Sequence, residues 1–153
     1  MSDIYKPYEI LTDKVNLPDR LLPKNIEIST VSNRSDLNKL LDLFLKIFPD
    51  EIDSEKAMQL RALQIPKYDG CFIARIYDKI IGFLIAGITN QVGYISYLGV
   101  EDRYRGQGVA TALLKHLKLY LKQNGVQKLR CTIRKDNKKT LGYIDFLGFQ
   151  LLG

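Results

Sequence analysis

The 153-residue sequence has few of the side chains that most hydrolases and metalloproteins need. It contains no tryptophan, one histidine (His116) and two cysteines, Cys71 and Cys131, which lie 60 positions apart. The single histidine leaves one candidate base for a serine or cysteine nucleophile, and neither cysteine has a second ligand at metal-binding spacing. We therefore predict no metal site and no disulfide framework, and we expect two reduced core thiols in a cytoplasmic protein.

Long hydrophobic runs are also absent. The longest uncharged apolar run, residues 80–88, has nine residues, whereas a membrane-spanning helix needs about twenty. The first ten residues carry charges and a proline where a signal peptide needs an apolar core. With 46% hydrophobic and 26% charged residues, the composition is that of one globular domain, and we expect no membrane partner.

Positive charge is concentrated in one part of the sequence. Residues 103–139 contain eleven lysines and arginines and one acid, Asp136, whereas the rest of the chain has more acids than bases. A basic stretch of this kind raises the local concentration of an anionic partner; the alternative is a solvated helix face formed by Lys115, Lys118 and Lys122. Because the stretch has no recognised nucleic-acid-binding motif, we do not expect nucleic acid to be that partner.

Hydrophobic periodicity predicts both helices and strands. Residues 1–24 hold three of the five prolines and little periodicity, so we expect an extended N-terminal arm before a single domain over residues 25–153. Ser35 and Asp36 offer caps for the first helix. The expected helices cover 37–48, 54–64, 109–123 and 138–147, and the expected strands cover 26–31, 71–77, 80–88, 92–100, 126–133 and 149–152.

The order of these elements predicts an α/β fold, an α+β sandwich whose mixed, mostly antiparallel sheet has helices on both faces. Short turns join the strands between residues 71 and 100, so these strands are expected to be antiparallel neighbours. The helix over 109–123 crosses the sheet, which makes the strands over 92–100 and 126–133 run parallel.

The segment between that crossover helix and the strand before it is the most informative part of the sequence. The start of a helix leaves backbone N–H groups without internal partners and adds the positive end of the helix dipole, which together favour an anion. Glycines at 106 and 108 let the backbone approach phosphate oxygens closely, and Arg103 and Arg105 add charged donors. These features predict a diphosphate site.

Two common nucleotide loops do not fit this segment. Gly108 is followed by Val109 and Ala110, whereas a mononucleotide loop continues with Lys and Ser or Thr. The dinucleotide fingerprint needs glycine or alanine at position 111, which is Thr111, and an acid about twenty residues later, where Arg130 stands instead.

The loop does resemble the acyl-CoA pyrophosphate loop of the GNAT superfamily of N-acetyltransferases, Arg/Gln-x-x-Gly-x-Gly/Ala. The likeness spans residues 26–152 in element order. It implies acetyl-CoA as cosubstrate, with its pantetheine arm against the strand over 92–100, which splays away from the strand over 126–133. The residues that carry it are Leu98, Gly99 and Val100 in the strand, Arg105, Gly106, Gln107, Gly108, Val109 and Ala110 in the loop, and Asn137 and Gly148-Phe149 downstream.

The resemblance implies direct attack of a neutral amine on the acetyl thioester, with a tyrosine that protonates the leaving thiolate. In this sequence the family's tyrosine position is Ile144, and its neighbour Tyr143 is rotated by about 100° around the helix. We take Tyr143 as the catalytic candidate; the alternative is that it packs against the sheet or faces solvent. Asn137 either bonds the pantetheine or caps the short helix. For the base, Tyr94, Ser96 and Tyr97 acting through water are the candidates.

The displaced tyrosine keeps a second hypothesis open, a noncatalytic acyl-CoA-binding regulatory module. For an enzyme, the acceptor is a primary amine, either small or on a peptide or protein, and residues 50–55 include four acids that would attract a cationic one. The alternative is that these acids only favour the start of the next helix.

The family's usual last strand has no counterpart before Gly153. Because an open sheet edge invites pairing, either the chain is cut, or the N-terminal arm or a neighbouring subunit of a homodimer closes the edge. We predict that part of residues 4–11 lies along the main body.

Overall fold

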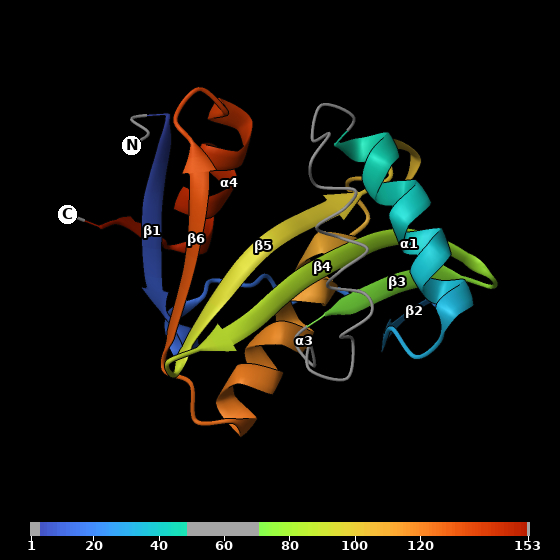
Figure 1. Ribbon diagram of the computed structural model, residues 1–153, viewed down its shortest axis with the longest axis horizontal. Helices are drawn as coiled ribbons and strands as arrows, with labels where there is room; N and C mark the ends of the chain where they lie inside the picture. The colour runs from blue at the N-terminus through green and yellow to red at the C-terminus, as the bar shows by residue number, and fades with distance from the viewer. Residues whose placement is uncertain (1–3, 49–70, 153) are drawn as a thin grey trace.

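The computed structural model describes residues 4–48 and 71–152, which form a seven-stranded sheet flanked by helices (Figure 1). The strand order is β2-β3-β4-β5-β6-β1-β7. The strands are β1 (Tyr5–Leu11), β2 (Ile26–Thr30), β3 (Phe72–Ile76), β4 (Lys79–Thr89), β5 (Val92–Val100), β6 (Lys128–Arg134) and β7 (Gln150–Leu151). The helices are α1 (Arg34–Ile47), α3 (Val109–Gln123) and α4 (Lys138–Leu147), and two 3₁₀ turns are η1 (Thr12–Lys14) and η3 (Asp102–Tyr104).

Two hydrophobic clusters, one on each face of the sheet, explain why β4 is buried along most of its length. Ile81 and Leu84 belong to the cluster that α3 and α4 cover, whereas Ile80 and Phe83 belong to the cluster under α1. A strand covered by helices on both faces reads as a continuous apolar run rather than an alternating one. The predicted α/β fold, with a mixed and mostly antiparallel sheet, is therefore confirmed.

The N-terminal segment supplies a strand of its own to this sheet. β1 pairs antiparallel with β6 along its whole length, from Tyr5 opposite Arg134 to Leu11 opposite Lys128, and pairs with β7 on its other side. The prediction that part of residues 4–11 lies along the main body is confirmed. The arm therefore lies beside β6, as one of the alternatives predicted, and the homodimer stays a prediction.

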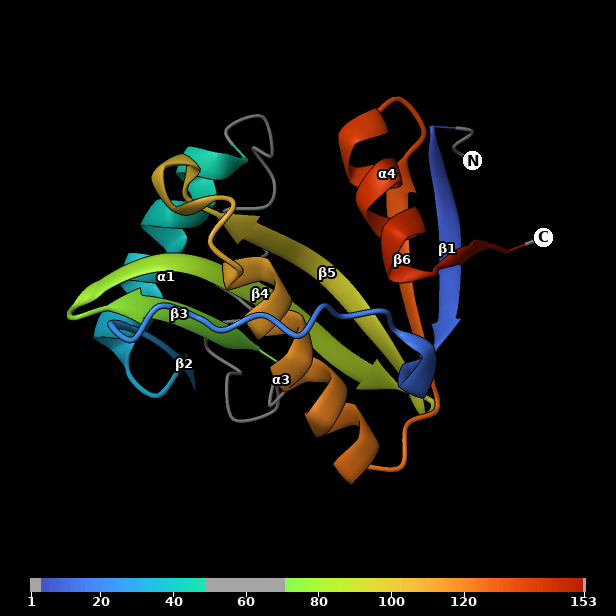
Figure 2. The same ribbon diagram turned by 180° about the vertical axis from the view of Figure 1, so that it is seen from behind.

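The chain then returns across α3 before it enters β2 (Figure 2). The backbone N–H of Thr12 donates to the Gln127 carbonyl at 2.8 Å, and the Lys118 side chain of α3 donates to the Val15 carbonyl at 3.3 Å. Val15 is buried in the cluster that contains α3. The segment after β1 is therefore attached to the body at several points.

The start of α1 differs from the prediction. Asn33 is the N-cap, because its side chain accepts a hydrogen bond from the Asp36 N–H at 2.8 Å, and the helix begins at Arg34. Asp36 is buried and accepts instead from Arg75 of β3 at 2.9 Å, which holds the pKa of its carboxyl below the usual value. Proposing Ser35 and Asp36 as caps was therefore wrong, because Asp36 is used in a tertiary ion pair.

The remaining predicted elements lie close to the observed ones, and the predicted parallel pairing of the strands over 92–100 and 126–133 is confirmed. The helix predicted over 54–64 and the acids at 50–55 lie outside the described residues. Within residues 4–48 and 71–152, no helix is long and apolar enough to cross a membrane.

Candidate functional site

The two parallel strands β5 and β6 separate halfway along their length. They pair from Val92 opposite Lys128 to Ile95 opposite Cys131, and no pairing continues beyond these residues. In the β4–β5 ladder, Ile85 lies opposite Tyr97 and Ala86 opposite Ile95, so Ser96 is an extra residue in β5. A bulge of this kind bends its strand, and β5 leaves β6 at this point (Figure 1). The splay that the resemblance implied is therefore present.

A cleft of about 580 Å³ opens where the strands part. Its wall is formed by β5, β6 and α4, with Tyr5 contributed by β1 and Leu114 by α3. Five predicted site residues line it: Ser96, Tyr97, Leu98, Asn137 and Tyr143. Both polar side chains, such as Ser96 and Thr140, and apolar side chains, such as Leu98 and Ile144, therefore line the cleft.

Tyr143 carries a buried hydroxyl that has no hydrogen-bond partner in the described part of the chain. Burial raises the pKa of this phenol, and the Thr111 side chain, which lies close but outside hydrogen-bonding geometry, offsets part of that rise. Ile144, at the family's tyrosine position, is 6% exposed and also lines the cleft. The Tyr143 ring packs against the core cluster, as the alternative predicted, and also lines the cleft. Its buried hydroxyl lies near Thr111 of α3, so a ligand in the cleft has to uncover this hydroxyl before it can accept a proton from it.

The other cleft side chains have distinct roles. Asn137 caps α4, because its side-chain oxygen accepts from the Thr140 N–H at 3.2 Å, so the capping alternative is the one observed. Ser96 and Tyr97 line the cleft, but Tyr94 does not. Cys131 lies at the last β5–β6 pair, where burial raises its pKa to about 12 and keeps the thiol protonated at neutral pH.

The glycine loop has the backbone geometry that its sequence predicts. Gly106 has a φ of 79° and Gly108 a φ of 88°, and both values lie in the left-handed region that favours glycine. Gly108 is the N-cap of α3 and provides no side-chain cap, and no acid stands in the first turn. The first amides of α3 are therefore available to an anion.

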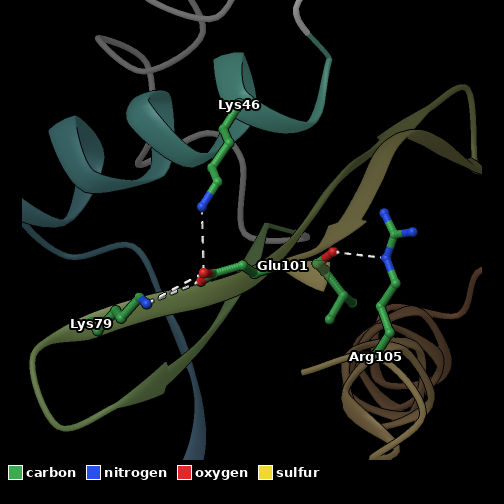
Figure 3. Close-up of polar contacts among 5 residues, drawn as sticks. Lys46, Lys79, Glu101 and Arg105 are labelled. Carbon is green, nitrogen blue, oxygen red and sulfur yellow. Dashed lines mark hydrogen bonds and ion pairs between the residues drawn. The ribbon is translucent and has the colours of Figure 1, made fainter. Parts of the chain in front are cut away.

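Arg105 is engaged by the loop itself. Its Nε donates to the Val100 carbonyl at 3.2 Å (Figure 3), and its Nη1 lies 3.0 Å from the Asp102 carboxylate. Val100 and Gly99 are buried and do not line the cleft, and of the strand landmarks only Leu98 does. Arg105 thus ties the loop to the end of β5.

Two residues that sequence reasoning missed also hold this loop. Glu101, the first residue after β5, is buried with 5% of its side chain exposed, and its carboxylate pairs with Lys46 at 3.4 Å and Lys79 at 3.3 Å (Figure 3). Arg20, from the N-terminal segment, donates from its Nη2 to the Gly106 carbonyl. The one sequence signal for Glu101 is an acid placed directly after a buried strand. No pattern in the residues around Arg20 indicates its contact with the loop.

Replacing Glu101 by glutamine should lower the free energy of unfolding by about 1–2 kcal/mol, because two ammonium groups lose a buried carboxylate. Asp102→Asn is the matched control, since Asp102 pairs with Arg105 but its side chain is 86% exposed; we expect a loss below about 0.5 kcal/mol there. Urea unfolding of both variants measures the difference. Equal losses in the two variants would contradict an anchoring role for Glu101.

Comparison with known proteins identifies relatives of this arrangement. The model of the acetyltransferase (GNAT) family matches residues 37–149. A GCN5-related N-acetyltransferase from Sphaerobacter thermophilus has a TM-score of 0.74 and 19% identity, over 97% of this chain and 48% of that one. The ribosomal-protein-S18-alanine N-acetyltransferase from Escherichia coli has a TM-score of 0.69 and 24% identity, over 84% of this chain and 79% of that one.

The paia N-acetyltransferase from Thermoplasma acidophilum, solved in complex with coenzyme A, has a TM-score of 0.68 and 16% identity, over 82% of this chain and 89% of that one. At these identities the structural likeness concerns the fold. The chain described here spans about half the length of the Sphaerobacter protein.

Proposed function

Because the chain belongs to the GNAT acetyltransferase family, we propose that it transfers an acetyl group from acetyl-CoA to a primary amine. The observation that carries this proposal is the cleft between β5 and β6, with the unpartnered Tyr143 hydroxyl, together with the glycine loop at the start of α3. The parted strands and the loop offer the backbone donors that an acyl thioester and a diphosphate need.

The described residues fit coenzyme A in their chemistry. The first amides of α3, with the left-handed Gly106 and Gly108, would hold the diphosphate. A Cβ at Gly106 would meet no atom within 4 Å, so this side of the loop is open to a ligand. The edge of β5 at Leu98 and the free amide nitrogen of Asn137 would hold the pantetheine.

Acetyl-CoA, when bound, supplies a thioester carbonyl that a neutral amine can attack. Backbone N–H groups of β5 beyond Ile95, which have no strand partner on the β6 side within the described residues, would donate to the oxygen as negative charge develops. Tyr143 would give its proton to the leaving sulfur and recover one from water. The C–N bond forms as the C–S bond breaks, the amine proton passes to water, and no group of the protein becomes acylated.

The acceptor is proposed only as an amine class. A cationic acceptor rests on the acids at 50–55, which lie outside the described residues, so both a small amine and a peptide or protein amine are carried forward. Within the described residues, Arg134 is the one charged side chain that lines the cleft, and Asp136 pairs with it at 2.9 Å. The described walls therefore add no free carboxylate for an ammonium group.

A second candidate is a noncatalytic acyl-CoA-binding regulatory module. Its support is the buried Ile144 at the position where the family carries its tyrosine. Such a module would keep the glycine loop and the cleft but would not release thiol from acetyl-CoA.

One experiment separates the candidates. Calorimetric titration with CoA is followed by measurement of thiol release from acetyl-CoA with a panel of polyamines, peptides with free N-termini, and neutral or acidic amines. Binding with amine-dependent thiol release supports the acetyltransferase, and binding without release at any amine supports the module. Absence of CoA binding would overturn both proposals.

A further inference from the structure

Arg20 reaches the glycine loop from a distant part of the sequence. Its Nη2 donates to the Gly106 carbonyl, and its Cδ lies 3.2 Å from where a Cβ on Gly108 would be. The guanidinium has no carboxylate or other hydrogen-bond partner within residues 4–48 and 71–152. Among the described residues, the hydrogen bond of this guanidinium is therefore the one to the glycine loop.

The backbone on either side fixes where Arg20 lies. Before it, the Asn16 N–H donates to the Leu147 carbonyl at 2.9 Å, and Leu17 packs against the core. After it, Leu22 packs against the same core, and the chain continues into β2. Figure 2 shows this segment running across α3 on its way to β2. Arg20 is thus presented to the loop by an attached segment.

The contact determines the orientation of one peptide unit. In a trans peptide, the carbonyl oxygen and the N–H of the next residue point in opposite directions. Because the Gly106 carbonyl points at Arg20, the Gln107 N–H points to the other side of the loop. Gly106 and Gly108 could otherwise rotate with little steric resistance. We propose that Arg20 is a positioning residue that aims the Gln107 amide at the diphosphate of CoA, an inference that rests on the proposed function.

Two arginines then hold the loop at different places. Arg105 bonds its base, at the Val100 carbonyl, and Arg20 bonds its tip, at the Gly106 carbonyl. A loop whose amides are oriented before the ligand arrives does not lose that conformational freedom on binding, which raises affinity. Arg20 acts through the backbone, so the ligand need not touch the guanidinium.

The test uses the full chain with three variants: Arg20→Gln, Arg20→Lys, and Arg34→Gln as a matched loss of charge at an exposed arginine at the start of α1. Calorimetry with CoA and 3′-dephospho-CoA gives dissociation constants at several salt concentrations. Amide NMR with inorganic pyrophosphate follows the Gln107 N–H. Where turnover is found, KM is compared for acetyl-CoA and S-acetylpantetheine, which lacks the diphosphate.

We expect Arg20→Gln to weaken both CoA and 3′-dephospho-CoA by about fivefold to tenfold, the range of one misplaced hydrogen bond, with unchanged thermal stability. Arg20→Lys should recover part of the loss, Arg34→Gln should lose nothing, and kcat and the KM for S-acetylpantetheine should stay at the wild-type values. The Gln107 amide should respond less to pyrophosphate in Arg20→Gln than in wild type.

Three results would overturn the positioning role. The first is an unchanged affinity of Arg20→Gln for CoA. The second is a rise in the KM for S-acetylpantetheine as large as the rise in the KM for acetyl-CoA. The third is a CoA affinity that depends less on salt in Arg20→Gln than in wild type, which would mean that the guanidinium contacts phosphate directly. If the wild-type protein binds no CoA, the proposed function fails. The role of Arg20 can still be tested in that case, by comparing how strongly the Gln107 amide signal responds to pyrophosphate in wild type and in Arg20→Gln.

Discussion

Replacing Tyr143 by phenylalanine is expected to lower kcat about 100-fold and to leave the dissociation constant of CoA unchanged. The substitution removes only the hydroxyl, which is buried at the cleft without a protein hydrogen-bond partner among the described residues. The ring keeps its packing, so binding and folding should be preserved. The loss would fall on the step in which the sulfur leaves, because a thiolate departs less readily without a proton donor.

The pH dependence of kcat/KM in wild type and in Tyr143→Phe provides a second test. Burial raises the pKa of Tyr143 above the ordinary value of 10.0, so the phenol stays protonated, and able to donate, at every pH below that value. In wild type, kcat/KM should rise as the acceptor amine loses its proton and should fall only above pH 10. The phenylalanine variant should show the same rise at a lower level and no such fall.

Tyr77→Phe is the matched control, since Tyr77 is an exposed tyrosine in the β3–β4 turn and does not line the cleft. It should keep wild-type kcat and CoA affinity. An unaltered kcat in Tyr143→Phe would mean that Tyr143 only packs in the cleft wall. An enzyme would then need another proton donor.

The parts of the site that were predictable from sequence are those whose cause is local. Gly106 and Gly108 adopt left-handed φ because the chain must turn directly before α3, and both the turn and the helix can be read from neighbouring residues. The parallel pairing of β5 and β6 follows similarly from the length of the crossover helix between them.

The missed parts depend on contacts between distant segments. The Ser96 bulge is defined by register against β4, and Glu101 needs Lys46 and Lys79 from two other elements. Arg20 is separated from Gly106 by 86 positions. No pattern within a short window carries such information, so these residues could be recognised only once the chain was folded.

The arm illustrates a different difficulty, because its local signals opposed its final state. Three prolines and little periodicity in residues 1–24 predicted an extended arm and gave no sign of a strand, and Pro7 lacks the N–H that a central strand donates. In the sheet, β7 pairs with β1 only at Tyr8 and Glu9, and near Pro7 the Leu152 N–H donates to its carbonyl at 3.0 Å. Proline is tolerated at this position because the neighbouring chain uses only the Pro7 carbonyl, as a hydrogen-bond acceptor, and no neighbouring strand requires an N–H from residue 7.

Burial predicts that this strand is part of the cooperative fold. Ile10→Ala is expected to lower the free energy of unfolding by about 2–4 kcal/mol, because Ile10 is 7% exposed and its Cδ1 lies 3.0 Å from where a Cβ on Gly148 would be. Leu11→Ala, the next residue on the opposite face, is 48% exposed and should cost below about 0.5 kcal/mol. Urea unfolding followed by far-UV circular dichroism measures both.

A frayed arm would give the opposite result, with similar small losses at both positions and a single unchanged transition for the rest of the sheet. The expected asymmetry matters for the site as well. β1 contributes Tyr5 to the cleft wall, and the segment that follows it carries Arg20 to the glycine loop. If Ile10 anchors β1, then the arm holds one wall of the cleft and one contact of the loop in place. Partial urea should in that case weaken CoA binding in Ile10→Ala before it does so in Leu11→Ala.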